Sequence, residues 1–86
     1  MTEKIDEKVD VITIYKRNGN VVIPIKIRWN GKYYNVKKLG YHHREKVGNI
    51  IYHIFHVSTD TLALRLRHNP IDLQWILEEV ADGFIN

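Results

Sequence analysis

The sequence contains no cysteine. This absence excludes a disulfide framework, a zinc site built on thiolates and a cysteine nucleophile, and it agrees with a reducing compartment. Long apolar runs are absent as well. The longest stretch without Asp, Glu, Lys or Arg runs from Val47 to Thr59 and carries two histidines, so it falls short of the ~20 apolar residues that a membrane span needs. We therefore expect a cytoplasmic protein with no membrane partner.

Catalytic motifs are equally scarce. Ser58 is the only serine and has no glycine elbow around it, and there is no glycine-rich phosphate loop. Glu78 and Glu79 are adjacent, so on a strand they point to opposite faces and form no general acid/base pair. A chain of 86 residues has room for one core. We expect a single small β domain over residues 1–86, not an enzyme, with no cofactor.

Period-two alternation, interrupted by turn dipeptides, predicts antiparallel strands. The segment Val9–Arg17 is rich in β-branched residues and stops at Asn18-Gly19, which favours a two-residue hairpin turn. The segment Val21–Trp29 alternates apolar with polar residues and stops at Asn30-Gly31, which has the same turn chemistry.

A turn at Asn30-Gly31 fixes the register of the second hairpin. It pairs Trp29 with Lys32, Arg28 with Tyr33, Ile27 with Tyr34, Lys26 with Asn35, Ile25 with Val36 and Pro24 with Lys37. One face is then apolar: Ile23, Ile25, Ile27, Trp29, Tyr34 and Val36. The other face is basic and carries one ring: Pro24, Lys26, Arg28, Tyr33, Asn35 and Lys37. Because Pro24 cannot donate a ladder hydrogen bond, we expect it at an edge or a bulge.

The second half of the chain predicts more strands. We interpret the polar residues from Tyr41 to Asn49 as a strand end and a loop, Ile50–Val57 as a central strand, and Thr61–Arg67 as a fifth strand after a turn at Ser58–Asp60.

The segment 69–84 fits two structures. Asn69 as N-cap and Pro70 at the first helical position favour an amphipathic helix, whereas a turn at Asn69–Asp72 favours a last strand over about 73–80. The strand is preferred because it would cover an open sheet edge. The fold expected is all-β: a six-stranded antiparallel meander forming a small, partly closed SH3-like or OB-like barrel, the alternative being a β sheet plus one C-terminal helix.

Two motifs in the chain are Pro24-x-Lys26-x-Arg28-Trp29-x-Gly31-x-x-Tyr34-x-Val36 and Trp75-x-Leu77-Glu78-Glu79-Val80-x-Asp82-Gly83. Together they resemble a group of short, uncharacterised bacterial β proteins, whose related-looking modules occur beside lesion-bypass DNA polymerases. The resemblance implies an all-β fold, a terminal strand and a loose association with DNA transactions. It assigns no catalytic or binding residue.

Basic residues are concentrated in the middle of the chain. From Val11 to Arg67 there are eleven basic residues against two acidic ones, a net of +9 in a protein whose total is +3. Lys and Arg hold phosphates, and exposed rings stack on unpaired bases, so this pattern favours single-stranded DNA or RNA as a partner. The candidate binding residues are Lys26, Arg28, Tyr33, Lys37, Arg65 and Arg67. The alternative is that these cations only keep the sheet face soluble.

A metal site is not expected. His53 and His56 are three residues apart, so a strand sends their rings to opposite faces. A cross-strand set of His42, His56 and His68 lacks a nearby carboxylate other than Asp60 or Asp72. The two tryptophans, Trp29 and Trp75, are expected in the core.

A rival function belongs to a different class. An exposed strand edge or the acidic residues 78–82 could serve a protein partner or a homodimer, so the alternative is a protein-interaction or self-association adaptor.

Overall fold

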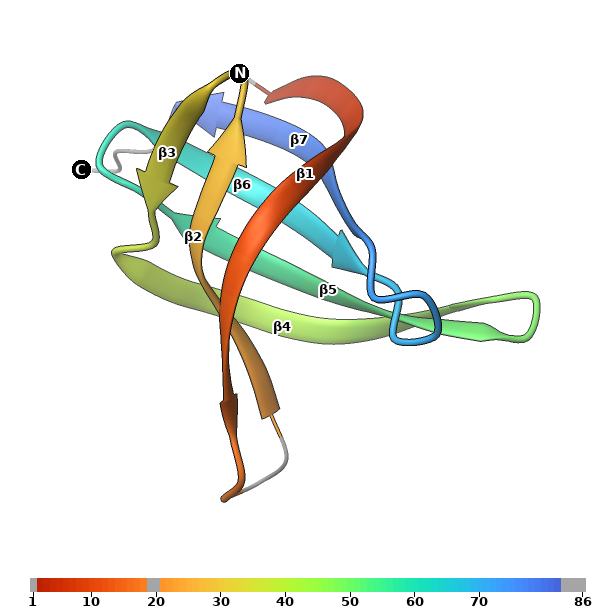
Figure 1. Cartoon of the computed structure of the whole chain (residues 1–86). Coiled ribbons are helices and arrows are strands. Elements are labelled where there is room, and N and C mark those ends of the chain that lie inside the picture. The colour runs from red at the N-terminus through yellow and green to blue at the C-terminus, as the bar shows by residue number, and fades with distance from the viewer. Residues whose placement is uncertain (1, 19–20, 83–86) are drawn as a thin grey trace.

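The computed structural model describes residues 2–18 and 21–82, and these residues form strands and no helix (Figure 1). The strands are β1 (Thr2–Lys16), β2 (Val21–Trp29), β3 (Lys32–Asn35), β4 (Lys38–Val47), β5 (Ile50–Ser58), β6 (Leu62–His68) and β7 (Trp75–Asp82). The expected all-β class is confirmed, and the alternative helix is not seen in the described part of segment 69–84.

All seven strands belong to one antiparallel sheet with the order β3-β2-β1-β7-β6-β5-β4. The first and last strands pair with each other, so the sheet curls round and its two edges are β3 and β4, which follow one another in the chain (Figure 1). Among the described residues no ladder joins β3 to β4. The six-stranded, partly closed barrel predicted from the sequence is therefore corrected to an open, coiled sheet of seven strands.

The additional strand is β4, most of which the sequence analysis assigned to a loop. Residues Lys38–Val47 are polar, but they pair along β5 from Lys38 opposite Ser58 to Val47 opposite Ile50, with an irregularity between Leu39 and His42. An edge strand with one solvent-facing side needs few apolar residues, which is why its composition resembled that of a loop.

Both hairpin registers follow the turn dipeptides. Asn30 and Gly31 have φ values of 53° and 74°, as the predicted turn requires, and Arg28 pairs with Tyr33 as expected. Lys16 pairs with Val21, the register that a turn at Asn18-Gly19 predicts. Gly19 itself lies outside the described residues.

Pro24 lies beside a bulge, as predicted, but the bulge reverses the faces that the alternation assigned. In the β1–β2 ladder Ile12 pairs with Lys26 and the next residue, Thr13, pairs with Pro24, so Ile25 is left without a partner. Pro24 is fully buried, whereas Ile25 is 36% exposed. Pro24 therefore leaves the basic face and Ile25 leaves the apolar face, while Ile27, Lys26 and Arg28 keep the predicted sides.

The predicted turn at Asn69–Asp72 is present and leads into β7. The Asn69 side chain accepts a hydrogen bond from the N–H of Ile71 at 2.8 Å, and the N–H of Leu73 donates to the Asn69 carbonyl at 2.8 Å. Leu73 then adopts φ of 65°, which stops helical growth and turns the chain into the strand.

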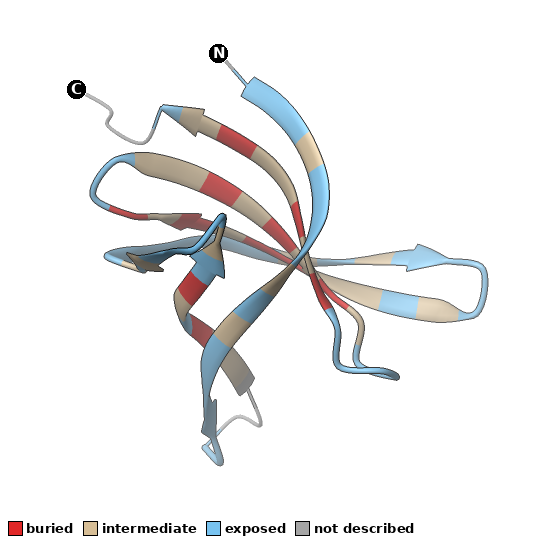
Figure 2. Cartoon of the chain, turned by 45° about the horizontal axis from the view of Figure 1, so that its top comes forward, coloured by how far each residue is buried: buried red, intermediate tan, exposed pale blue. Residues whose placement is uncertain are grey.

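The concave side of the sheet holds the core. Buried residues recur along β2, β5, β6 and β7 (Figure 2). Trp75 is 7% exposed and belongs to this core, whereas Trp29 only packs against its rim. The indole N–H of Trp29 donates to the Glu7 carboxylate at 3.1 Å. The core cluster consists of Ile27, Phe55, Val57, Leu64, Leu66, Trp75, Leu77 and Val80.

Candidate nucleic-acid interface

Lys26, Arg28 and Tyr33 converge on the outer face of the β2–β3 hairpin. The Nζ atom of Lys26 lies 5.5 Å from the centroid of the Tyr33 ring, and the Cζ atom of Arg28 lies 5.8 Å from it. Both cations lie near the ring because Tyr33 is directly opposite Arg28 in the ladder and Lys26 is the next residue on the same side of β2. Tyr33 is 62% exposed, so most of its surface remains open to solvent.

These two cations are only lightly compensated by acidic groups. Nη1 of Arg28 is 4.0 Å from a carboxylate oxygen of Asp10, and both side chains are more than half exposed. Such a pair contributes little, because water screens it and both side chains stay mobile. Lys26 forms no ion pair with any residue in the ranges 2–18 and 21–82. Both charges are thus accessible to an anion.

Arg65 and Arg67, in contrast, are engaged by carboxylates. Arg65 donates from Nε to Glu78 and from Nη2 to Glu45, both at 2.8 Å, and Arg67 lies 3.2 Å from Glu78. The hydrogen bond to Glu78 is the main reason that the pKa of Arg65 is raised above its ordinary value. Burial acts in the opposite direction, and the negative charges of Glu78, Glu45 and Glu79 add to the increase. Arg67 also stacks over the Tyr52 ring at 5.0 Å.

A bulge explains how one carboxylate serves two arginines. Arg65 pairs with Glu79 and the next residue, Leu66, pairs with Leu77, so Glu78 is the extra residue in β7. Its side chain turns to the same outer side as Glu79, which corrects the expectation that these two glutamates face opposite ways.

The structure therefore divides the predicted binding residues into separate groups. Strands β1 and β7 lie between β2 and β6 in the sheet, so Arg65 and Arg67 are not beside the Tyr33 cluster. Lys37 lies at the corner between β3 and β4, where its N–H donates to the Ser58 carbonyl and its Nζ is 3.9 Å from Asp60. Only Lys26, Arg28 and Tyr33 form one cluster.

The histidines also form two groups, one on each side of the sheet. On the concave side, Nε2 of His42 is 3.1 Å from Nδ1 of His53, and His53 pairs across the ladder with His68. On the outer side, the ring of His43 stacks on those of His56 and Tyr41, with ring centroids 5.5 Å and 4.9 Å apart. The structure thus separates His56 from His42 and His68. The contact of His42 with His53 was not expected, because residues Tyr41 to Asn49 were interpreted as a strand end and a loop and not as a full strand paired with β5.

Desolvation is the main reason that the pKa of each of His42, His53, His56 and His68 is lowered from its ordinary value. Neighbouring positive charge adds to the effect: Arg44 acts on His53, and His53 acts on His68. These imidazoles are therefore neutral near pH 7. In the described ranges no three His, Asp or Glu side chains are placed so that they could hold a metal ion.

Comparisons with known protein families, curated proteins and solved structures find no match to this chain. The resemblance to short bacterial β proteins stays a prediction. A search of the described residues finds no helix long and apolar enough to cross a membrane.

Proposed function

We propose that this protein is a non-enzymatic module that binds single-stranded DNA or RNA through Lys26, Arg28 and Tyr33. One observation carries the proposal: two lightly compensated cations lie within 6 Å of the centroid of one exposed tyrosine ring, on the β2–β3 hairpin. An aromatic ring offers a stacking surface to an unpaired base, and flanking cations attract the phosphates on either side of that base.

The mechanism is electrostatic attraction followed by stacking. Each phosphate that a lysine or arginine neutralises releases condensed counterions, which drives association and makes it depend on salt. Stacking of a base on Tyr33 adds about 1–3 kcal/mol and tolerates any base, because every base presents a π-face. The binding is therefore weakly selective for sequence. The hairpin supplies the geometry because its turn fixes Tyr33 opposite Arg28.

The test is fluorescence anisotropy of a labelled oligo-dT and the matching oligo-U, measured at about 50 mM and about 200 mM salt. With two phosphates engaged, the logarithm of the association constant falls with the logarithm of salt with a slope of about −1.4. Tyr33→Ala weakens binding about tenfold, and Arg28→Gln reduces the slope by about 0.7.

Two matched variants control for general effects. Tyr41 is 68% exposed, similar to Tyr33, but its ring contacts His43 and His56 instead of a lysine or arginine. Tyr41→Ala is therefore expected to leave the affinity for the oligonucleotide unchanged. Lys46→Gln removes an exposed positive charge from β4 and also leaves the affinity unchanged. Binding that ignores salt, or that Tyr41→Ala weakens as much as Tyr33→Ala, contradicts the proposal.

A second candidate is self-association or protein recognition at a strand edge, and the open sheet favours it. β3 and β4 are edge strands, and the outer side of β1 exposes Ile12 by 51% and Ile14 by 45%. Unpaired edges beside apolar side chains are the surfaces that accept an added strand. The acidic segment 78–82 is less suited than the sequence indicated, because Glu78 is already paired with two arginines. A stable dimer in sedimentation that ignores added oligonucleotide favours this candidate.

A further inference from the structure

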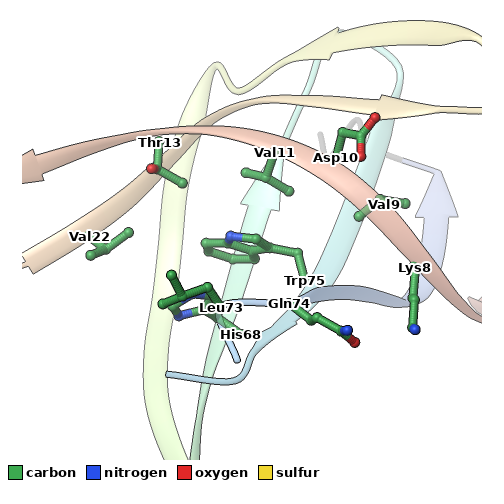
Figure 3. A pocket seen from close by; sticks show the side chains of 10 residues that line it. All are labelled: Lys8, Val9, Asp10, Val11, Thr13, Val22, His68, Leu73, Gln74 and Trp75. Carbon is green, nitrogen blue, oxygen red and sulfur yellow. The ribbon is translucent and has the colours of Figure 1, made fainter. Parts of the chain in front are cut away.

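A pocket of about 570 Å³ opens between β1, β2 and the turn that precedes β7 (Figure 3). This volume lies within the range of small-molecule sites in proteins. Strand β1 passes along one side of the pocket and the Leu73 side chain stands on the opposite side, with the Trp75 ring between them (Figure 3). The pocket is separate from the Tyr33 cluster, because none of Lys26, Arg28 and Tyr33 lines it.

Two aromatic rings that are tilted against each other form the base of the pocket, and neither is hydrogen-bonded to a described residue. His68 and Trp75 are directly opposite each other in the β6–β7 ladder, and their ring centroids are 4.4 Å apart. They are 8% and 7% exposed. Neither the imidazole nitrogens of His68 nor the indole N–H of Trp75 makes a hydrogen bond to any residue in ranges 2–18 and 21–82. In these ranges the only side-chain nitrogen or oxygen that is both buried and unbonded is Nε of Arg67, so the ring nitrogens of His68 and Trp75 reach the pocket surface. A ligand in the pocket can therefore bond them.

The walls combine apolar contact with polar groups, and Lys8 and Asp10 on β1 add one charge of each sign to the lining. Val11 and Val22 supply apolar surface from β1 and β2, and Thr13 and Gln74 add a hydroxyl and an amide. Leu73 completes the wall. The turn holds it there, because the N–H of Leu73 is bonded to the Asn69 carbonyl and its φ is 65°. This lining is suited to a flat, uncharged ring with donors and acceptors along one edge.

We propose that this pocket binds a nucleobase, presented as a free nucleoside or as an unpaired nucleotide. The base lies between Leu73 and the valines of β1 and β2, and its edge bonds to His68 and Trp75. A neutral imidazole has one donor and one acceptor, and the indole has one donor, which matches the alternating groups on the edge of a base. Desolvation lowers the pKa of His68, so the imidazole is in this neutral form near pH 7. A purely hydrocarbon ring would leave these polar groups unbonded.

The test uses adenosine and uridine, which carry no phosphate, so the result does not depend on the Tyr33 cluster. Each nucleoside is titrated into isotopically labelled protein while the Trp75 indole and His68 ring signals are followed by NMR. The expected result is saturable shifts of both signals and an affinity that does not change between about 50 mM and about 200 mM salt, since no counterions are released. Phenol is titrated in parallel as a ring of similar width with a single polar group.

Two variants separate the proposal from effects on folding. His68→Phe keeps the ring contact with Trp75 but removes both nitrogens, and it weakens nucleoside binding about fivefold, which is the effect of one hydrogen bond. Leu73→Gly removes one wall of the pocket and also weakens binding. Glycine readily adopts the positive φ of this position, so the substitution does not strain the backbone. Ile71→Gly, in the same turn but outside the pocket, is the control and leaves binding unchanged.

Three results overturn the proposal: neither nucleoside shifts the Trp75 and His68 signals, phenol binds as well as both nucleosides, or His68→Phe binds nucleosides as well as the natural protein does. These results leave the salt-dependent binding of oligonucleotides at Tyr33 untouched. The two proposals can also fail the other way round. If nucleosides bind but Tyr33→Ala has no effect on oligonucleotide binding, the pocket is supported and the function proposed for the hairpin is contradicted.

Discussion

Arg65 donates from Nε to a carboxylate oxygen of Glu78 at 2.8 Å, joining β6 to β7 on the outer side of the sheet. Glu78 also lies 3.2 Å from Arg67, and Arg65 reaches Glu45 on β4. The carboxylate of Glu78 therefore ties two guanidinium groups in place, and these arginines stabilise the sheet instead of presenting free charge to a ligand.

Glu78→Gln is expected to destabilise the fold by about 1–3 kcal/mol, because two arginines lose a charged partner in a partly buried position. Urea denaturation of the variant and the natural protein measures the difference. Asp60→Asn is the control, since the one ion pair of Asp60 within residues 2–18 and 21–82 is to the exposed Lys37 at 3.9 Å, and its expected effect is within about 0.5 kcal/mol. Equal stability of Glu78→Gln and the natural protein contradicts the structural role of this network.

Acidification below about pH 6.5 is expected to reduce stability. The pKa values of His42, His53 and His68 are lower in the folded state than in the unfolded chain, so the unfolded chain binds protons first as the pH falls. Their contribution is complete above about pH 6.5 and is lost towards the lower folded pKa values. Urea midpoints measured from about pH 8 to about pH 5 test this, a range in which most carboxylates stay ionised.

His53→Gln provides the matching variant for the pH dependence. Desolvation is the main cause of the lowered pKa values of His42 and His68, and the positive charge of protonated His53 adds to it. Without His53 both pKa values rise, so the loss of stability in acid becomes smaller. A stability that is constant, or that increases, between about pH 8 and about pH 5 disagrees with the lowered pKa values.

Gly40→Ala is expected to destabilise the fold by about 1–3 kcal/mol through steric overlap. A Cβ at position 40 would lie 2.9 Å from the backbone carbonyl oxygen of His56, and a backbone atom cannot move aside cheaply. Thermal unfolding measures the effect. Gly31→Ala is the comparison: it meets nothing within 4 Å but has φ of 74°, so its cost is backbone strain of about 1 kcal/mol. An unchanged melting temperature for Gly40→Ala would show that β4 and β5 are further apart here.

Local chemistry determined the parts of the fold that the sequence predicts correctly. The Asn30-Gly31 dipeptide defines both the turn and the pairing of Arg28 with Tyr33. The cluster of Lys26, Arg28 and Tyr33 therefore follows from the register of this one hairpin. The preference for a strand after Asn69–Asp72 is confirmed, because Leu73 leaves the helical region there.

Bulges and long-range partners account for what the sequence could not predict. One extra residue in β2 exchanges the sides of Pro24 and Ile25. One extra residue in β7 places Glu78 and Glu79 on the same outer side, although strict alternation puts them on opposite faces. The partners of Arg65 come from β4 and β7, at separations of 20 and 13 residues, which a pattern of period two does not reveal. The curl that places β1 and β7 between β2 and β6 likewise depends on the whole sheet.

The most direct measurement of the central claim is an amide-shift titration of the labelled protein with a short single-stranded oligonucleotide. The account predicts that the largest shifts fall on Lys26, Arg28 and Tyr33, that they diminish as salt is raised, and that the amides of Arg65 and Arg67 stay in place. The opposite pattern, with the hairpin unmoved and the shifts gathered on β6, or with no shift at all, would contradict it.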